Sequence, residues 1–288
     1  MENTIKKKQE GRKLSALLKR SGAKLKRGSS DPRVARLVID SRRVTPGSLF
    51  FALPGFLRDG NAFVDEALNR GAIAVVSNVP RKLGLSKAVF AQSDDPRLTL
   101  AKVARRFYRK PDRDLELVGI TGTNGKTTVA HLAKCFLSVD GSKTGCLGTV
   151  GYDLVERVLP SFRTTPEAHE LCELLSQMRA FGCDRVAMEV SSHGIDQLRV
   201  AELRFKAGVF LNLTRDHLDY HGDMESYFAV KRKFINGEIG PPPKRLAINV
   251  DDPYGRRLAD ESREERVLTF GLSEEASLKA TDVELAPD

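Results

Sequence analysis

The feature that most constrains the fold of this chain is the stretch LVGITGTNGKTT, which runs from Leu117 to Thr128. Its first four residues are apolar and predict a short buried strand, and the apolar positions 129, 132, 133, 136 and 137 recur at helical spacing. The glycine-containing turn between them leads into a helix N-terminus, where backbone N–H groups attract an anion. Lys126 adds a positive charge and Thr127 a hydroxyl suited to Mg²⁺. The stretch therefore predicts a nucleotide triphosphate site in an α/β fold.

The loop departs from the pattern GxxxxGK[ST], because Ile120 stands where that pattern has its first glycine and Gly119 comes one residue too early. An alternative interpretation is an ordinary strand-to-helix turn with an exposed lysine. The strand before the loop and the helix after it favour a phosphate-binding site, and the phosphates would be those of ATP or GTP. The residues expected to bind the nucleotide are Gly122, Thr123, Asn124, Gly125, Lys126, Thr127 and Thr128.

The composition is that of an ordinary globular protein. Of 288 residues, 41% are hydrophobic and 30% are charged, which is enough apolar surface for the cores of two domains. No apolar run approaches the roughly 20 residues that cross a bilayer. No apolar signal region follows the basic N-terminus either, so we expect a cytoplasmic protein without a membrane partner.

The charge and the cysteines argue against two further classes of protein, those that bind nucleic acid and those built on a cysteine metal site or disulfides. The net charge of +9 comes without an aromatic RNA-binding pattern, so a solvated basic tail and polyanionic small substrates explain it better than nucleic acid does. The four cysteines are scattered without metal-ligand spacing, and we expect them to be reduced core residues: Cys135, Cys146, Cys172 and Cys183.

The order of strand and helix patterns predicts an α/β protein of two domains after a leader. Residues 1–30 are charged and read as a weakly ordered leader. Residues 31–111 predict a small α/β domain, with strands near 34–40, 49–53, 72–77 and 87–91 and helices near 63–70 and 98–108. Residues 112–288 alternate strands and helices, which predicts a mostly parallel sheet covered on both faces. The expected strands are 117–120, 146–150, 185–190, 207–211 and 246–249, and the helices are 129–139, 166–181 and 224–235.

Polar clusters follow several of these strands, at the edge of a parallel sheet where ligands collect. Thr165 precedes Pro166 and is read either as a helix N-cap or as a substrate contact. Glu189 ends an apolar strand, where a Mg²⁺-linked carboxylate is expected. His217 and His221 lie four apart among Asp216, Asp219 and Asp223, so a zinc site is an alternative, although the further ligands of a zinc hydrolase are not identified by spacing. The helix residue Lys231 has no intrinsic feature that separates it from a solvated surface lysine.

Five motifs together resemble the Mur ligases in order and spacing: TGTNGKTT at 121–128, TTP at 164–166, EVSSHG at 189–194, NLTRDHLDYHG at 212–222 and YFAVK at 227–231. The segments DSR at 40–42, PG at 46–47, LFFA at 49–52 and residues 55–60 resemble the N-terminal, UDP-binding domain of that family. The resemblance extends from about residue 34 onward. It is greatest to the members that add the third amino acid of the peptidoglycan peptide.

The resemblance implies an ATP-dependent ligase that adds diaminopimelate or lysine to UDP-N-acetylmuramoyl-L-alanyl-D-glutamate through an acyl phosphate. By analogy, Lys126, Lys231 and His217 are catalytic, Thr127 and Glu189 with His217 bind Mg²⁺, and a carbamoylated Lys231 positions a second metal ion. The positions that match the binding site for the UDP-sugar peptide are Ser41, Thr164, Thr165, Ser191, Gln197 and Arg199, and the segment Phe56, Leu57 and Arg58 is expected to contact uridine. We expect a monomer.

Two departures from the family pattern accompany the resemblance. Arg163 stands where related enzymes often carry Asn or His. Members of the family also have a C-terminal domain that selects the incoming amino acid, and the sequence ends before it, with residues 277–285 read as a strand awaiting partners. We therefore keep two alternatives: a non-catalytic remnant that only binds nucleotide or UDP-muramoyl peptide, and a ligase of the folylpolyglutamate synthase type.

Overall fold

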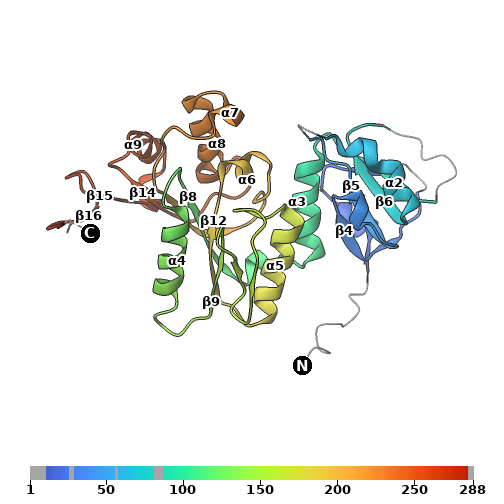
Figure 1. The fold of residues 1–288 in the computed structure, drawn as a ribbon, viewed down its shortest axis with the longest axis horizontal. Helices are drawn as coiled ribbons and strands as arrows, with labels where there is room; N and C mark the ends of the chain where they lie inside the picture. The colour runs from blue at the N-terminus through green and yellow to red at the C-terminus, as the bar shows by residue number, and fades with distance from the viewer. Residues whose placement is uncertain (1–10, 26–28, 56–57, 81–86, 285–288) are drawn as a thin grey trace. The chain divides into compact units, whose positions relative to one another are not determined.

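The computed structural model describes residues 11–25, 29–55, 58–80 and 87–284. The chain divides into two compact units, Met1–Arg109 and Lys110–Asp288 (Figure 1). Both are α/β, with mostly parallel sheets, as the sequence predicts. Among the described residues, no helix combines the length and the apolar character that a membrane span requires.

The first unit is built on a five-stranded sheet in the order β2-β7-β6-β5-β4. Strands β4 to β7 are parallel, and β2 pairs antiparallel with β7 at the edge. All four residues of β5 are buried, as expected for a strand inside a parallel sheet covered on both faces. The strand bounds are β2 Lys24–Leu25, β4 Arg36–Val38, β5 Ser48–Phe51, β6 Ala72–Ser77 and β7 Val89–Gln92.

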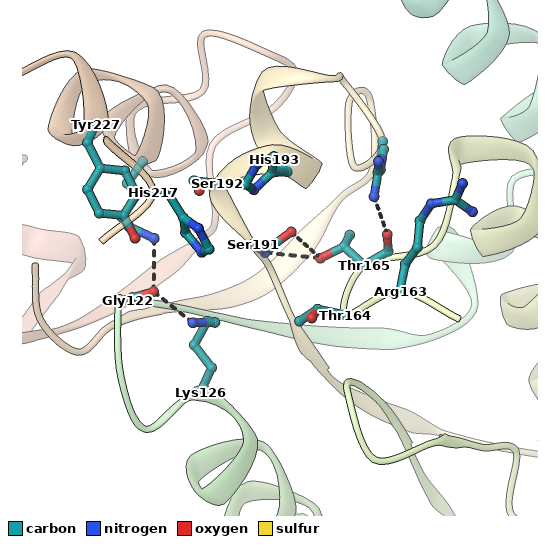
Figure 2. A pocket seen from close by; sticks show the side chains of 12 residues that line it. Gly122, Lys126, Arg163, Thr164, Thr165, Ser191, Ser192, His193, His217 and Tyr227 are labelled. Atoms are coloured by element: carbon teal, nitrogen blue, oxygen red, sulfur yellow. Dashed lines mark hydrogen bonds between the residues drawn. The ribbon is translucent and has the colours of Figure 1, made fainter. Parts of the chain in front are cut away.

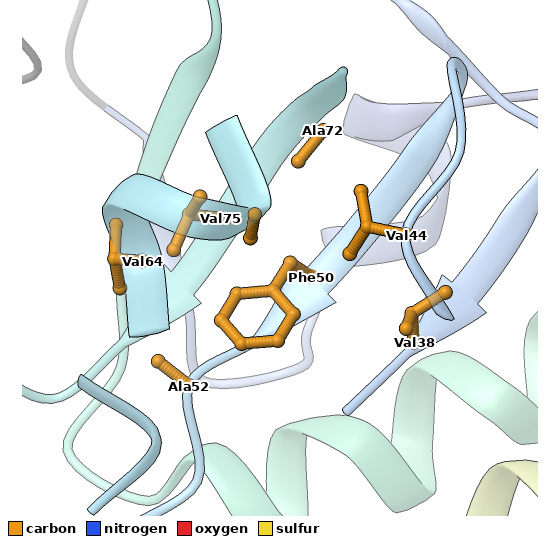
Figure 3. Packing of buried hydrophobic residues seen from close by; sticks show 8 residues of the cluster. Val38, Val44, Phe50, Ala52, Val64, Ala72 and Val75 are labelled. Atoms are coloured by element: carbon orange, nitrogen blue, oxygen red, sulfur yellow. The ribbon is translucent and has the colours of Figure 1, made fainter. Parts of the chain in front are cut away.

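Helices α2 (Val64–Asn69) and α3 (Pro96–Phe107) accompany this sheet, with the 3₁₀ turns η1 (Ser41–Arg43) and η2 (Gly60–Phe63). The Asp95 side chain accepts from the backbone N–H of Leu98, and Pro96 opens α3, which is the usual start of a helix. In Figure 3, the Phe50 ring lies in the centre of an apolar cluster formed by the sheet and α2, with Val38, Val44, Val64 and Val75 around it.

The prediction of a weakly ordered leader is wrong for residues 11–25. Strand β1 (Arg12–Lys13) pairs antiparallel with β3 (Arg33–Val34), and helix α1 (Leu14–Leu18) follows it directly. Leu14 and Leu17 are at most 1% exposed, and α1 packs against α3. The charged residues around these leucines lower the mean hydropathy of the segment, but the spacing of the leucines places them on one buried helix face.

The second unit contains a nine-stranded sheet in the order β11-β10-β9-β12-β8-β13-β14-β15-β16. The strands from β9 to β16 in this order are parallel to one another, and β10 and β11 form an antiparallel edge that the sequence did not predict. The bounds are β8 Glu116–Thr121, β9 Thr144–Leu147, β10 Tyr152–Asp153, β11 Val158–Leu159, β12 Arg185–Glu189, β13 Phe205–Phe210, β14 Arg245–Asn249, β15 Val267–Gly271 and β16 Leu278–Lys279.

Helices cover both faces of this sheet. Helix α4 packs on β8, β9 and β12, whereas α8 lies on the opposite face, where Phe234 approaches Gly119 so closely that a Cβ on Gly119 would lie 2.7 Å from its ring. Gly119 is therefore needed for helix packing rather than for the phosphate loop. The bounds are η3 Pro111–Arg113, α4 Lys126–Leu137, α5 Ala168–Ala180, α6 Ser192–Asp196, α7 Leu218–His221, α8 Met224–Asn236, α9 Pro253–Asp260 and η4 Glu264–Arg266.

Two smaller predictions need correction. The strand expected at 277–285 is only two residues long, and it is already paired in parallel with β15; its predicted end, Leu285, lies outside the described residues. Cys146, Cys172 and Cys183 are buried thiols as expected, but Cys135 is exposed on α4, because helical spacing turns it away from the sheet.

Candidate functional site

The predicted phosphate loop joins β8 to α4 as the sequence indicates. Gly125 precedes the helix with φ +81°, a left-handed conformation in which glycine is favoured. The first N–H groups of α4 have no intrahelical acceptor, because four donors are always unsatisfied at a helix N-terminus. The loop thus presents backbone donors and the positive end of the helix dipole to an anion.

Lys126 is folded back over this loop. Its Nζ donates to the Gly122 carbonyl at 3.1 Å and to the Thr123 carbonyl at 2.7 Å. Desolvation lowers the pKa of Lys126, against the opposing effect of Glu189 and Asp216. A phosphate in the loop would replace these two carbonyls as the partner of the ammonium group.

Asn212 follows β13 and fixes the other side of the loop. Its Oδ1 accepts from the backbone N–H groups of Thr123, at 3.1 Å, and Asn124, at 2.9 Å, and its Nδ2 donates to the Asn124 carbonyl. This role of Asn212 is not predicted from the sequence, although its position directly after an apolar strand was a signal. Because Asn212 occupies these two N–H groups, the donors oriented toward a phosphate are those at the start of α4.

The carboxylate of Glu189 lies beside the start of α4 and is buried, with 1% of the residue exposed. The Thr127 hydroxyl donates to both of its oxygens, each at 3.0 Å, and the backbone N–H of Thr149 donates to Oε1 at 2.8 Å. The structure thus brings together the hydroxyl and the carboxylate that the sequence analysis assigned to Mg²⁺. Oxygen donors of this kind are those that a hard divalent cation prefers.

Lys231 is almost completely buried on α8 and is not a surface lysine. Its Nζ donates to the Gly122 carbonyl at 2.9 Å and lies 4.7 Å from the centre of the Tyr227 ring. Burial, and secondarily the charge of Lys126, hold the pKa of Lys231 well below its usual value of 10.5. Its amine is consequently far more often neutral than that of a lysine in water.

Three imidazoles, those of His193, His217 and His221, pack against one another and against the phenol rings of Tyr220 and Tyr227; His193, His217 and Tyr227 line the same pocket as Lys231. His217, with φ +53°, lies with its ring 5.0 Å from that of His193, and the His221 ring stacks on Tyr227 at 4.8 Å. His221 Nε2 is hydrogen-bonded to the Ser192 hydroxyl, and burial lowers the pKa of His221 to about 4. His193 and Tyr227 were not among the predicted site residues.

The zinc alternative for His217 and His221 is not supported. Within the described ranges, no three His, Cys, Asp or Glu side chains are placed to hold one metal ion together. A four-residue spacing on α7 does not converge here, because His217 lies at the N-cap of that short helix in a left-handed conformation.

Thr165 is not the N-cap of a helix. Helix α5 begins at Ala168, and its cap is Glu167, which forms a capping box with Glu170. The Thr165 hydroxyl instead donates to the backbone carbonyl of Glu189 at 2.9 Å and accepts from the backbone N–H of Ser191. The hydroxyl therefore joins the segment after β11 to the end of β12.

Arg199 reaches the same segment from the end of α6. Its Nη1 donates to the Thr165 carbonyl at 2.9 Å, and its Nη2 lies 3.1 Å from Glu167 and 2.6 Å from the Gln197 side-chain oxygen. Glu167 is 5% exposed, so this ion pair is largely shielded from water. The guanidinium is thus held in a fixed orientation beside the two threonines.

Some of these residues line one pocket of about 320 Å³ (Figure 2). In Figure 2, Lys126 points from α4 toward Gly122, Thr164 and Thr165 lie to one side, and His193 and His217 lie above. Of the predicted site residues, the pocket gathers Gly122, Lys126, Thr164, Thr165, Ser191, Arg199, His217 and Lys231.

The other predicted residues do not line this pocket, among them five from the phosphate loop and the start of α4: Thr123, Asn124, Gly125, Thr127 and Thr128. Glu189 accepts a hydrogen bond from Thr127, which follows the pocket residue Lys126 in the chain. Gln197 accepts one from the pocket residue Arg199. Ser41 belongs to the first unit, where its hydroxyl donates to Glu66 at 2.7 Å. Arg58, also in the first unit, is exposed, and Phe56 and Leu57 lie outside the described residues.

The sequence and the fold of this chain are similar to those of known proteins. The family model described as the Mur ligase middle domain matches residues 120–288, and the one described as the Mur ligase family, catalytic domain, matches residues 33–111. The chain is 48% identical over 246 residues to a UDP-N-acetylmuramoyl-L-alanyl-D-glutamate–2,6-diaminopimelate ligase of Solibacter usitatus, covering 85% of this chain and 49% of that protein. A ligase of the same name from Pseudomonas aeruginosa is 41% identical, with 86% and 50% covered.

A solved structure of a ligase with this name superimposes with a TM-score of 0.68 at 28% identity, covering 85% of this chain and 50% of the other. MurF from Acinetobacter baumannii, at 21% identity and a TM-score of 0.61, shares the fold, with 89% and 52% covered. The chain thus spans about half the length of the curated relatives it matches.

Proposed function

The chain belongs to the Mur ligase family, and on that premise we propose that it forms the ATP- and acceptor-binding part of an amide ligase. The acceptor is UDP-N-acetylmuramoyl-L-alanyl-D-glutamate and the added amino acid is 2,6-diaminopimelate, as in the names of the relatives. These shared names favour diaminopimelate over lysine and disfavour a folate substrate. The reaction consumes ATP, and we assign it to the cytoplasm.

The observation that carries this proposal is the meeting of two lysines at one carbonyl. Lys126 from the phosphate loop and Lys231 from α8 both donate to the Gly122 oxygen, at 3.1 and 2.9 Å. Two ammonium groups this close repel each other, so the pair is better suited to one cation and one modified amine. A nucleotide-binding loop alone requires only the first of them.

The chemistry assigns a task to each part of the pocket. A free carboxylate of the D-glutamate attacks the γ-phosphorus of ATP, ADP leaves, and the amine of the incoming amino acid then displaces phosphate from the acyl phosphate. Lys126 and the N–H groups of α4 hold the transferred phosphate. Thr164, Thr165, Ser191 and Arg199 hold the acceptor peptide, with Gln197 orienting Arg199.

The donor set fits the magnesium ion that the family implies, because Thr127 and Glu189 are already in contact. We assign Thr127, Glu189 and His217 to it, and a carbamoylated Lys231 to a second metal ion. When bound, Mg²⁺ offsets the negative charge of the phosphates. Carbamoylation joins the neutral Lys231 amine to CO₂ with loss of a proton, and it turns a buried cation into an oxygen-bearing anion.

We assign residues 31–111 to binding of the UDP group and residues 112–288 to binding of ATP. In the first unit, Ser41 is the described residue that we assign most directly to the UDP group. Its hydroxyl donates to Glu66, which fixes its orientation. Arg58, with Phe56 and Leu57, is assigned to the uridine.

Calorimetric titration with ATP and Mg²⁺ tests the nucleotide assignment. Lys126→Ala removes a charged hydrogen-bond donor, and we expect ATP to bind about 10- to 100-fold more weakly. Lys134→Ala is the matched control, because Lys134 lies on the same helix but pairs with Asp153 outside the pocket. Equal loss of affinity in both variants would contradict the assignment of Lys126.

Trapping with hydroxylamine tests whether this chain carries out the first chemical step. With ATP and UDP-N-acetylmuramoyl-L-alanyl-D-glutamate, an acyl phosphate would be converted to a hydroxamate, with release of one ADP for each. Binding of both ligands without hydroxamate would identify a binding-only chain. Binding of a folate in place of the UDP-muramoyl peptide would reject the proposed acceptor.

A further inference from the structure

A short turn after β9 lies directly against the proposed metal-binding carboxylate. The backbone N–H of Thr149 donates to Glu189 Oε1 at 2.8 Å, and the Thr149 hydroxyl lies 3.4 Å from Oε2. Glu189 is buried, whereas Thr149 is largely exposed. The turn therefore contributes to the orientation of the carboxylate, while the Thr149 side chain contributes little to the core.

Gly148 leaves the space that the carboxylate occupies. A Cβ at residue 148 would lie 2.2 Å from Glu189 Oε1 and 2.9 Å from Cδ, distances that real Cβ atoms do not adopt. The backbone of the turn and the carboxylate are thus fitted to each other, and a side chain at position 148 would displace the carboxylate.

The hydrogen bonds of Glu189 come from two kinds of donor, one that is itself assigned to the cation and one that is not. The Thr127 hydroxyl, which donates to both carboxylate oxygens, belongs to the first kind, because its lone pairs can also bind a cation. Among the described residues, the donors to the Glu189 side chain that do not themselves belong to the proposed metal-binding set both come from Thr149. Hydrogen-bond donors that contact a metal ligand without binding the metal themselves usually fix the orientation of that ligand.

The Thr149 hydroxyl also reaches the acceptor side of the pocket. It lies 3.0 Å from the Thr164 hydroxyl, and either oxygen can be the donor. A continuous path of hydrogen bonds therefore runs from Thr164, through Thr149, to Glu189. The turn contacts both the nucleotide side and the acceptor side of the proposed site.

We infer that Thr149 is a positioning residue for Glu189, and that the Gly148–Thr149 turn holds this carboxylate in the orientation that binds the divalent cation of the nucleotide. The inference rests on the proposed function, since it assumes that Glu189 binds Mg²⁺. Thr149 is assigned to act through Glu189 and is not itself among the residues assigned to the metal ion, the phosphates or the acceptor.

The test is the gain in ATP affinity that Mg²⁺ produces, measured by calorimetry on the full chain as the ratio of the Kd in EDTA to the Kd in Mg²⁺. Loss of an outer hydrogen-bond partner commonly weakens metal binding about 10- to 100-fold. We expect Gly148→Ala to reduce the ratio about 10-fold or more and Thr149→Val to reduce it severalfold, because the valine keeps the backbone N–H. The Kd in EDTA should stay unchanged in both.

Thr149→Ser keeps the hydroxyl and should restore the wild-type ratio. Thr144→Val is the control, because the Thr144 hydroxyl is buried on β9 without a hydrogen-bond partner in the structure and does not touch Glu189. Melting curves followed by circular dichroism identify a variant that fails to fold. If Gly148→Ala fails to fold, the result for Thr149→Val alone decides whether the inference holds.

Glu189→Gln separates the two ways in which the inference can fail. If the wild-type chain shows no Mg²⁺-dependent gain, or if Glu189→Gln keeps it, the magnesium assignment itself is wrong. If Glu189→Gln loses the gain while Thr149→Val and Gly148→Ala keep it, the magnesium assignment stands and the positioning role is overturned. A loss of ATP affinity in EDTA as well would show a structural role of the turn and would also overturn the inference.

Discussion

At the scale of single residues, the environment of Lys231 decides its chemistry. The side chain is buried beneath the phosphate loop, against the Gly122 carbonyl and the face of Tyr227. A charged amine at this place is disfavoured by desolvation and by Lys126, which is the reason for its lowered pKa. The neutral amine is the form that reacts with CO₂.

Carbamoylation of Lys231 is testable by ¹³C NMR with labelled bicarbonate. We expect a carbamate signal in the wild-type chain that is absent in Lys231→Met. Because the pKa of Lys231 is lowered, the neutral amine is present below pH 10.5 and is lost only as the pH falls through the lowered value. The signal should therefore persist to a lower pH than a carbamate on an exposed lysine would.

Lys233→Met provides the matched control, since it lies on the same helix but not in the pocket. A carbamate signal that survives Lys231→Met, or that disappears in Lys233→Met, would contradict the assignment.

At the scale of elements, the first helix shows how a short segment becomes part of a core. Helix α1 has five residues, too few to be stable alone, and three of them are buried leucines. Its order comes from packing against α3 and from β1, which pairs with β3. A helix of this kind depends on tertiary contacts rather than on its own propensity.

Leu17→Ala should therefore destabilise the first unit. Removing a fully buried leucine side chain costs about 2–5 kcal/mol of unfolding free energy, through lost apolar burial and a residual cavity. Urea unfolding followed by circular dichroism measures the change. Ala16→Ser, on the exposed side of the same helix, should change the free energy by less than about 0.5 kcal/mol. Equal stability of Leu17→Ala and the wild type would mean that α1 does not contribute to the core.

At the scale of the whole molecule, each of the two units has its own sheet and its own apolar cluster. Phe50 lies in the cluster of the first unit, and Ile120 in that of the second. All residues that line the candidate pocket belong to the second unit. The two proposed ligands, UDP and ATP, are thus assigned to different units.

Scanning calorimetry with each ligand tests this division. A ligand at 100 times its Kd stabilises the folded form that binds it by about 2.7 kcal/mol. ATP with Mg²⁺ should raise the melting temperature of the second unit, and UDP should raise that of the first. The transition of the first unit is identified as the one that Leu17→Ala shifts to a lower temperature. A shift of the first unit's transition by ATP alone would contradict the division.

The sequence by itself determined the alternation of strands and helices, the phosphate loop and the polar residues at the strand ends. These features are local: a buried strand needs a run of apolar residues, and a phosphate loop needs glycine and lysine beside a helix start. The sequence also carried the motifs by which the family resemblance was stated. It did not distinguish Lys231 from Lys233, because burial is not a property of a single position.

Only the tertiary structure decided which of these residues meet. It placed Lys231 and Lys126 on one carbonyl, used Asn212 to occupy two N–H groups of the loop, and replaced the expected N-cap at Thr165 by Glu167. It also set Thr149 and Gly148 against Glu189. These contacts join segments far apart in the chain, and their distances depend on the packing of whole strands and helices. No local pattern in the sequence specifies that packing.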